Sequence, residues 1–304
     1  GFAGSGAVTP PLVSVVMPTR NRAAFLHRAI RSVLAQTETR IELIVVDDAS
    51  SDETPAVVAQ YAQADSRVRG VRNEIAAGGG GARNIGIRSG GGQWVAFIDD
   101  DDEWLPEKLE RQLALLAGDP AAVACSCGFE QHFPSGKVRT VHLPDRPALK
   151  DLLVGSVLGG ASMCLCSRAV LDGIGGYDTA LRSGQDWDLW TRLREQGEIA
   201  VCREVLVRYQ AHDGPRISNN MASQYQGARR FYFKHRSKMS SATRRLRIAY
   251  ACFIMSRQLT RSFRARLKYL LLAVRHAPLR VGLSYTASSL PRLMADVFSS
   301  GRGR

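Results

Sequence analysis

The sequence predicts an α/β fold with a mainly parallel, doubly wound sheet, and the order of segments in its first hundred residues carries this prediction. Apolar runs of strand length alternate with amphipathic segments of helical spacing, which gives the order βαβαβαβ. This order implies parallel strands joined by right-handed helical crossovers. The run LVSVVMP is apolar almost throughout, as expected for a strand buried in a parallel sheet. The expected strands are residues 12–18, 41–50, 68–73 and 93–102, and the expected helices are residues 19–36, 51–63 and 78–92.

The rest of this part of the chain continues the same domain, which we predict to span residues 12–218. Residues 1–11 are small and polar and indicate a flexible arm or a tag remnant. The further expected elements are a helix at 107–117, a strand at 121–130, an irregular or hairpin-forming segment at 131–150, a strand at 161–171, a helix at 184–197 and strands within 199–214.

Charge divides the chain into two parts. Residues 216–304 contain 19 Lys and Arg but a single acid, Asp296, whereas residues 1–215 contain 22 basic and 27 acidic residues. Segments such as FYFKHRSK and RRLRIAYACFIMSRQL have apolar residues at helical spacing and arginine on the other face. We therefore predict a basic amphipathic helical region at residues 219–304.

Composition excludes several other classes of protein. A hydrophobic content of 45% is ordinary for a globular chain. No run reaches the roughly 20 apolar residues that a membrane-spanning helix needs. The pairs Cys125/Cys127 and Cys164/Cys166 have the two-residue repeat of a strand, which favours buried, reduced cysteines over a zinc site. No secretion signal accompanies them, so we expect a cytoplasmic protein.

Polar residues follow three of the expected strands. They are Pro18-Thr19-Arg20, Asp47-Asp48 and the four aspartates Asp99–Asp102. Because ligands of open α/β sheets bind at the carboxyl ends of the strands, we expect these groups to converge on one crevice. Clustered carboxylates at such a place suit a hard divalent cation, Mg²⁺ or Mn²⁺. The competing interpretation is a solvated acidic turn.

Several segments together resemble glycosyltransferase family 2, whose members have the Rossmann-like GT-A fold. FIDDDDEWLPEKLERQL is similar to the Asp-x-Asp segment of that family, and VSVVMPTRNRAAFLHRAIRSVLAQT and IELIVVDDASSDET are similar to its first two strand–helix units. GIGGYDTALRSGQDWDLWTRL resembles its acceptor loop and catalytic helix, and YQAHDGPRIS its histidine loop. The resemblance covers about residues 12–218 and implies a metal-dependent, inverting transfer from a nucleotide sugar.

The resemblance also implies roles for individual residues on the donor side. Asp48 is expected to recognise the nucleotide base, with Thr19 and Arg83 in the same pocket, and Asp99 to lie near the ribose. Asp100 occupies the middle position of the motif, and Asp102 is either a further metal-shell residue or a cap of the next turn. The expected donor-binding residues are Pro18, Thr19, Arg20, Asp48, Arg83, Asp99 and Asp100, and the expected metal ligands are Asp101 and His212.

On the acceptor side, Asp186 resembles the general base of inverting members. Such a base takes the proton of the attacking hydroxyl from the face opposite the leaving diphosphate. Trp187 and Asp188 are expected near the acceptor, although Asp188 also fits an exposed charge or a cap. The family commonly has Glu before the base, whereas this chain has Gln185, which removes one negative charge beside Asp186.

Two further features are weaker signals. Arg208 and Arg216 are candidates for neutralising the diphosphate near His212. The run Gly78–Gly81 fits neither a P-loop nor a dinucleotide fingerprint, and we interpret it as a flexible loop before the helix that carries Arg83.

The basic region at residues 219–304 has two compatible interpretations. Its helices suit an anionic membrane surface, which would place the protein at the cytoplasmic face of the inner membrane beside a glycan or lipid-linked acceptor. Alternatively, their apolar faces pack as a helical bundle on the catalytic domain or on another subunit. The sequence disfavours nucleic-acid binding, because no aromatic residues alternate with the arginines in a recognisable motif.

Two other functions compete with a glycosyltransferase that uses UDP-sugars. A sugar-1-phosphate nucleotidyltransferase would share the sheet and the metal site, but it would carry a glycine-rich, lysine-containing loop where this chain has Pro18-Thr19-Arg20-Asn21. A non-catalytic glycan- or nucleotide-binding module would not need Asp186. The sugar, the linkage and the oligomeric state are left open.

Overall fold

The computed structural model describes residues 10–211, 221–258, 268–269, 271–272 and 275–276. The chain divides into two compact units, Gly1–Pro215 and Arg216–Arg304. Following the resemblance described above, we call the first the catalytic unit, and we call the second the basic unit.

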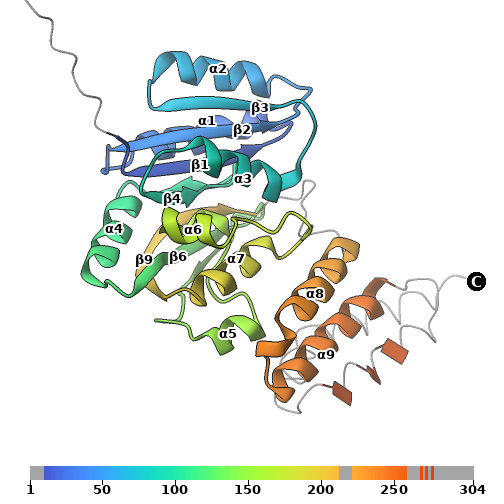
Figure 1. Ribbon diagram of the computed structural model, residues 1–304. Helices are drawn as coiled ribbons and strands as arrows, with labels where there is room; N and C mark the ends of the chain where they lie inside the picture. Colours follow the sequence, from blue (N-terminus) through green and yellow to red (C-terminus); the bar gives the residue numbers. More distant parts are fainter. Residues whose placement is uncertain (1–9, 212–220, 259–267, 270, 273–274, 277–304) are drawn as a thin grey trace, which may run out of the picture. The chain divides into compact units, whose positions relative to one another are not determined.

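Within the described residues of the catalytic unit, nine strands form one sheet in the order β3-β2-β1-β4-β8-β6-β9-β5, with β7 paired to β6 (Figure 1). The longest ladders, β1 with β2 and β6 with β9, are parallel, and the shorter pairings of β8, β5 and β7 are antiparallel. This confirms the predicted α/β fold with its mainly parallel sheet. The strands are β1 (Val13–Thr19), β2 (Ile41–Asp48), β3 (Val68–Asn73), β4 (Trp94–Phe97), β5 (Glu103–Trp104), β6 (Ala122–His132), β7 (Val138–Val141), β8 (Leu165–Ser167) and β9 (Glu198–Gln210).

Helices cover both faces of this sheet (Figure 1). Neighbouring residues of a strand point to opposite faces, so each buried strand packs against both layers of helices. Val15 of β1 packs into the core formed with α1, α2 and α4, whereas Val16 packs into the core formed with α3, α5, α6 and α7. The helices are α1 (Ala23–Leu34), α2 (Thr54–Ala64), α3 (Gly78–Ser89), α4 (Lys108–Gly118), α5 (Leu149–Val154), α6 (Arg168–Gly173) and α7 (Gln185–Arg194), with a 3-10 turn η1 (Ala161–Met163).

The glycine run Gly78–Gly81 is the first turn of α3, so our interpretation of it as a flexible loop is wrong. A Cβ on Gly81 would lie 2.7 Å from the Cβ of Ala77, and one on Gly86 would lie 2.3 Å from Val16 Cγ1. Glycine at these positions lets the helix start abruptly and lie directly on β1. The close approach fixes where the start of α3 stands relative to the strand ends.

Two strand predictions also need correction. Residues 161–171 form η1, the short strand β8 and α6 in place of one strand. The strand expected at 93–102 ends at Phe97, so the aspartates lie in the turn between β4 and β5. The turn forms here because Asp99 and Asp102 close it, with the Asp102 N–H donating to the Asp99 carbonyl at 3.1 Å.

Other predictions are confirmed. Strand β6 covers the strand expected at 121–130, and its hairpin with β7 lies in the segment 131–150 that we expected to be irregular or hairpin-forming. The four cysteines of the pairs Cys125/Cys127 and Cys164/Cys166 are buried and free, as predicted, and so is Cys202.

The described part of the basic unit contains α8 (Met221–His235), η3 (Arg236–Lys238) and α9 (Ser241–Gln258). Helices α8 and α9 contact each other, and Phe231, Leu246 and Ile254 are buried. Their polar faces are basic, with exposed side chains at Arg229, Arg230, Lys234, Arg236, Lys238, Arg244 and Arg245. The amphipathic helices predicted for this part of the sequence are therefore present.

Candidate functional site

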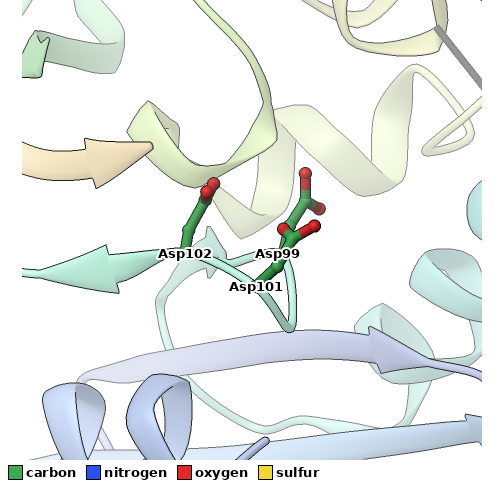
Figure 2. Close-up of side chains that lie close together, drawn as sticks. All are labelled: Asp99, Asp101 and Asp102. Carbon is green, nitrogen blue, oxygen red and sulfur yellow. The ribbon is translucent and has the colours of Figure 1, made fainter. Parts of the chain in front are cut away.

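The aspartate turn gathers three carboxylates (Figure 2). Asp99, Asp101 and Asp102 each offer one oxygen, and these oxygens all lie within 4.8 Å of one another. The Ser162 hydroxyl of η1 accepts the Asp99 N–H at 3.0 Å and donates to the Asp102 carboxylate. Three carboxylate oxygens at this spacing can hold a hard divalent cation. We call Asp99, Asp101 and Asp102 the aspartate cluster.

Asp102 belongs to this cluster and does not cap the following turn. Its carboxylate accepts the Ser162 hydroxyl and, at 3.2 Å, the N–H of Gln210 on β9. The side chain is buried, and burial together with the charges of Asp99 and Asp101 raises the pKa of Asp102 well above its ordinary value. A carboxyl held so close to like charges favours a bound cation.

Asp100 points away from the cluster. It accepts the Thr19 hydroxyl at 2.7 Å, and its other oxygen lies 3.8 Å from the Arg22 guanidinium. Burial raises the pKa of Asp100 to about 7, while Thr19 and Arg22 act in the opposite direction. Thr19 is therefore next to the aspartate turn, as expected, whereas Arg20 is exposed and Pro18 is half-buried.

The sequence did not identify two arginines that partly neutralise the turn. Arg22, which immediately precedes α1, pairs with Asp101 at 3.0 Å. Arg28, one and a half turns further along α1, donates to the Asp101 carbonyl at 2.7 Å. Arg20 lies two residues before Arg22 and carries the same charge. The sequence alone therefore does not indicate which of the two arginines reaches the turn; the course of the backbone into α1 determines it.

Asp48 holds the start of α3. Its carboxylate accepts the N–H groups of Ala77 and Gly78 at 2.7 and 2.8 Å, and the Asn73 amide at 2.7 Å. Capping of this kind satisfies donors that a helix start leaves without partners. The contact of Asp48 with a nucleotide base stays a prediction.

Arg83 on α3 connects the aspartate cluster with Asp186. Its guanidinium pairs with Asp99 and lies 5.3 Å from the ring centre of Tyr177. Burial lowers the pKa of Arg83, but the charges of Asp99 and Asp186 and the nearby Tyr177 outweigh it, so the pKa stands above its ordinary value. Arg83 thus pairs with the aspartate cluster, and its place in the nucleotide pocket beside Asp48 stays a prediction.

Asp186 lies in the first turn of α7, directly after Gly184 and Gln185. Gly184 has a φ of +73°, which favours glycine and turns the chain into the helix. Asp186 Oδ1 is buried and has no hydrogen-bond partner among the described residues. Burial raises the pKa of Asp186, Arg83 lowers it, and Asp99 raises it. A carboxylate that keeps an uncommitted oxygen and has a raised pKa is suited to accept a proton.

The two residues after Asp186 anchor α7. The Trp187 indole donates to the Leu152 carbonyl of α5. Asp188 is fully buried and pairs with Arg192 at 2.7 Å, so the alternative of an exposed charge is wrong. Their contact with an acceptor stays a prediction.

The remaining predicted residues, Arg208, His212 and Arg216, lie near or after the end of β9. His212 and Arg216 lie outside the described residues. Arg208 pairs with Glu103 at 3.0 Å, across the β5–β9 ladder. That partner accounts for the charge of Arg208 without a bound diphosphate.

Together, the parallel sheet, the carboxylates at its strand ends and Asp186 across Arg83 define the architecture of a GT-A-type glycosyltransferase. The model of the family described as "Glycosyl transferase family 2" matches residues 14–167. The chain therefore belongs to glycosyltransferase family 2 and is a glycosyltransferase, not a nucleotidyltransferase or a non-catalytic binding module.

Two of the similar bacterial proteins are named as glycosyltransferases. TuaG of Bacillus subtilis (strain 168), named for teichuronic acid biosynthesis, is 29% identical over 231 residues, which are 74% of this chain and 88% of TuaG. The UDP-Glc:alpha-D-GlcNAc-diphosphoundecaprenol beta-1,3-glucosyltransferase WfgD of Escherichia coli is 42% identical over 105 residues, 34% of this chain and 41% of WfgD.

Solved structures share the fold. The S. aureus TarS 1-349 complex with UDP-GlcNAc has a TM-score of 0.65 at 19% identity and covers 88% of this chain and 82% of TarS 1-349. The mannosyltransferase PcManGT of Pyrobaculum calidifontis, in complex with GDP-Man and Mn²⁺, has a TM-score of 0.60 at 20% identity and covers 98% of this chain and 82% of PcManGT. Among the described helices, none is both long and apolar enough to cross a membrane.

Proposed function

We propose that this enzyme is a metal-dependent, inverting glycosyltransferase that moves a sugar from a nucleoside-diphosphate donor to a hydroxyl of a lipid-linked glycan acceptor. One observation carries the proposal. Asp186 Oδ1 is buried without a hydrogen-bond partner in the part of the chain that the structure describes, and Arg83 connects Asp186 to the aspartate cluster. Arg83 therefore interacts both with Asp186, the proposed proton acceptor, and with the aspartate cluster, which is proposed to hold the donor.

The aspartate cluster fits a divalent cation. Its three oxygens come from hard carboxylate ligands, and the raised pKa of Asp102 reflects negative charge that Arg22 and Arg83 only partly neutralise. Asp99, Asp101 and Asp102 would hold Mn²⁺ or Mg²⁺. When bound, the ion would offset the negative charge of the departing diphosphate. The presence of Mn²⁺ with GDP-Man in PcManGT is consistent with this assignment.

Asp186 acts in this proposal as general base. Its carboxylate accepts the proton of the acceptor hydroxyl while that oxygen attacks the anomeric carbon of the donor sugar, and the bond to the diphosphate breaks on the opposite face. One displacement inverts the anomeric configuration without a covalent sugar–enzyme intermediate. Burial raises the pKa of Asp186, and the positive charge of Arg83 acts against this and favours the ionised carboxylate.

The acceptor class follows from the relatives and from the basic unit. The name of WfgD includes a diphosphoundecaprenol-linked sugar, and the name of TuaG refers to teichuronic acid biosynthesis. In this chain, Phe233 of α8 is 52% exposed between the guanidinium groups of Arg229 and Arg236, at 5.7 and 5.3 Å from its ring centre. An exposed aromatic ring among cations suits the headgroup region of an anionic membrane, where such an acceptor lies.

The catalytic proposal is tested by Asp186→Asn. The asparagine keeps the shape of the side chain but cannot accept the proton, so we expect turnover to fall about 10²–10⁴-fold. Turnover is measured with UDP-Glc, UDP-GlcNAc and GDP-Man in the presence of Mn²⁺, and donor binding by the thermal shift that each donor produces. Binding should be retained. Asp172→Asn, an exposed carboxyl on α6, is the matched control, and full activity of Asp186→Asn would disprove the assignment.

The membrane proposal is tested separately. The full chain should float with vesicles that contain phosphatidylglycerol, and flotation should weaken as salt rises. Arg229→Glu/Arg236→Glu should reduce flotation, whereas Arg111→Glu, an exposed arginine of the catalytic unit, should not. Equal flotation of all three proteins would remove these residues from the membrane contact.

A further inference from the structure

Buried polar atoms without hydrogen bonds gather at one place in the catalytic unit. Among the described residues of this unit, four buried side-chain atoms have no hydrogen-bond partner, namely Arg83 Nε, Tyr177 Oη, Asp186 Oδ1 and Arg192 Nη2. The first three belong to residues that interact with one another, since Arg83 and Tyr177 both influence the pKa of Asp186. Buried groups are rarely left without partners unless a function needs them.

Tyr177 is held firmly at this place. Gly175 and Gly176 have φ values of +76° and +66°, and they turn the chain so that Tyr177 follows at once. The Tyr177 N–H donates to the Asn84 side chain at 2.7 Å, and the Asn84 amide donates back to the Tyr177 carbonyl at 2.8 Å. Asn84 follows Arg83 directly, so the same helix turn fixes the backbone of Tyr177 and carries the guanidinium.

The ring of Tyr177 is equally constrained. It meets Phe97 edge to face, with 5.2 Å between ring centres, and the Arg83 guanidinium lies 5.3 Å from its centre. The side chain is only 2% exposed. The hydroxyl therefore cannot turn to water for a partner, although a buried hydroxyl without one is costly.

We propose that Tyr177 is a positioning residue for the general base. Its hydroxyl donates to the Asp186 carboxylate when the donor is bound, which fixes the carboxylate so that the oxygen left without a donor faces the acceptor hydroxyl. This inference rests on the proposed role of Asp186 as the base. Oδ2 lies on the side of Gly160, where an added Cβ would stand 3.9 Å from it.

Several other groups face Asp186, and the hydroxyl acts among them. Arg83 comes from α3, Asp99 from the aspartate turn, and Cys164 and the Ala161 N–H from the segment around η1. Burial and the nearby Asp186 raise the pKa of Tyr177 well above its ordinary value, so the phenol keeps its proton at every working pH. Tyr177 can then only donate to Asp186, which favours the ionised carboxylate.

Tyr177→Phe tests the hydroxyl alone, because phenylalanine retains the ring that contacts Arg83 and Phe97. We expect the pKa of Asp186 to rise by about one unit, since a donor to the charged form is lost. This pKa is read by carbon-13 NMR of protein labelled at the aspartate carboxyls and saturated with Mg²⁺ and one of the three donors named below, with Asp186→Asn to assign the signal. We also expect turnover of UDP-Glc, UDP-GlcNAc or GDP-Man to fall about 10-fold with an unchanged KM for the donor.

The melting temperature separates positioning from structure. Removing a buried hydroxyl that has no partner should leave the melting temperature unchanged or slightly higher. Tyr61→Phe, a half-buried tyrosine that bonds His27 at 3.0 Å, is the matched control and should change neither turnover nor the Asp186 signal. A pKa of Asp186 that stays the same in Tyr177→Phe would overturn the inference, whatever happens to turnover. Full activity of Asp186→Asn would instead overturn the proposed base while the NMR result still reports on the contact.

Discussion

The aspartate cluster and the surroundings of Asp186 both contain carboxylates, but these carboxylates differ in whether they have hydrogen-bond or ion-pair partners. Each of the four aspartates in the turn has a partner: Arg83 for Asp99, Thr19 and Arg22 for Asp100, Arg22 for Asp101, and Ser162 with the Gln210 N–H for Asp102. Asp186 Oδ1 has none among the residues described. Each carboxylate of the turn therefore has a resident partner before any ligand arrives, although its negative charge is only partly neutralised, whereas Asp186 keeps one acceptor oxygen open.

This difference follows from what each region has to do. A set of carboxylates that holds a charged ligand must survive without it, and like charges at this spacing would otherwise repel one another in a buried turn. A group that takes a proton needs an oxygen that no resident donor occupies. Arg83 touches both regions, so its charge can serve the cluster and the base at once.

Arg83→Met should have the largest effect, because it breaks both regions together. Asp99 would lose its ion pair and Asp186 its nearby positive charge, so both carboxylates would be left with less compensating charge. We expect at least a 10³-fold loss of turnover together with a lower denaturant midpoint. Arg22→Met, which removes the ion pairs of Arg22 with Asp100 and Asp101, should keep the pKa of Asp186 unchanged. A variant of Arg83 with normal turnover would separate the two regions and refute the link between them.

Asp101→Asn and Asp186→Asn should separate the two regions. The first removes a ligand of the cluster, so the thermal stabilisation by Mn²⁺ should disappear and turnover should fall about 10²-fold or more. The second should lower turnover by the same roughly 10²–10⁴-fold as proposed above but keep the response to Mn²⁺. Thermal shift with and without 1,10-phenanthroline or EDTA measures the response. Retention of the Mn²⁺ effect in Asp101→Asn would show that the ion does not need this carboxylate.

The sequence predicted the cluster better than its surroundings. Strand ends and a run of aspartates are local signals, and parallel strands bring their carboxyl ends together, so Asp48 and Asp99–Asp102 could be assigned to one edge. The partners come from far along the chain, with Ser162 sixty residues from Asp102 and Arg22 seventy-nine from Asp101. Nothing local distinguishes Arg22 from Arg20, or Tyr177 from any other core aromatic.

The glycine run Gly78–Gly81 shows a second limit of prediction from local sequence. We interpreted the run as a flexible loop because it fits no phosphate-binding motif, and four glycines in a row also lower helix propensity. Two tertiary requirements outweigh that propensity, since the Asp48 carboxylate caps the helix start and Gly86 lets the same helix lie on β1. At Gly81 and Gly86 a neighbouring side chain takes the space that a Cβ would need.

Asp100→Asn should change how stability depends on pH. The folded pKa of about 7 stands above the unfolded value of 3.8, so this carboxyl favours folding fully below pH 3.8 and loses that contribution as pH rises through 7. The loss amounts to at most about 4 kcal/mol. Asparagine does not titrate, so the variant should lose less unfolding free energy than the wild type between pH 5 and pH 8 in urea titrations without metal. Parallel pH profiles of the two proteins would show that Asp100 titrates normally.

Gln185→Glu should have the smallest effect, and it tests whether the side chain next to Asp186 has to be neutral. The Gln185 amide donates to the Leu181 carbonyl and lies against the start of α3, where an added Cβ on Gly80 would be 3.3 Å from its nitrogen. A carboxylate there adds negative charge beside Asp186 and should raise the pKa of that base by about half a unit. The amide groups at the start of α3 would partly compensate.

Turnover of Gln185→Glu at pH 8 should therefore stay within about 3-fold of the wild type, with the acidic limb of the pH profile displaced upward. Gln63→Glu, an exposed residue of α2, changes the net charge equally and should leave the limb in place. A 100-fold loss in Gln185→Glu would mean that the side chain touches the reacting groups directly. A downward displacement of the limb would mean that the helix start, and not the neighbouring charge, controls the pKa of Asp186.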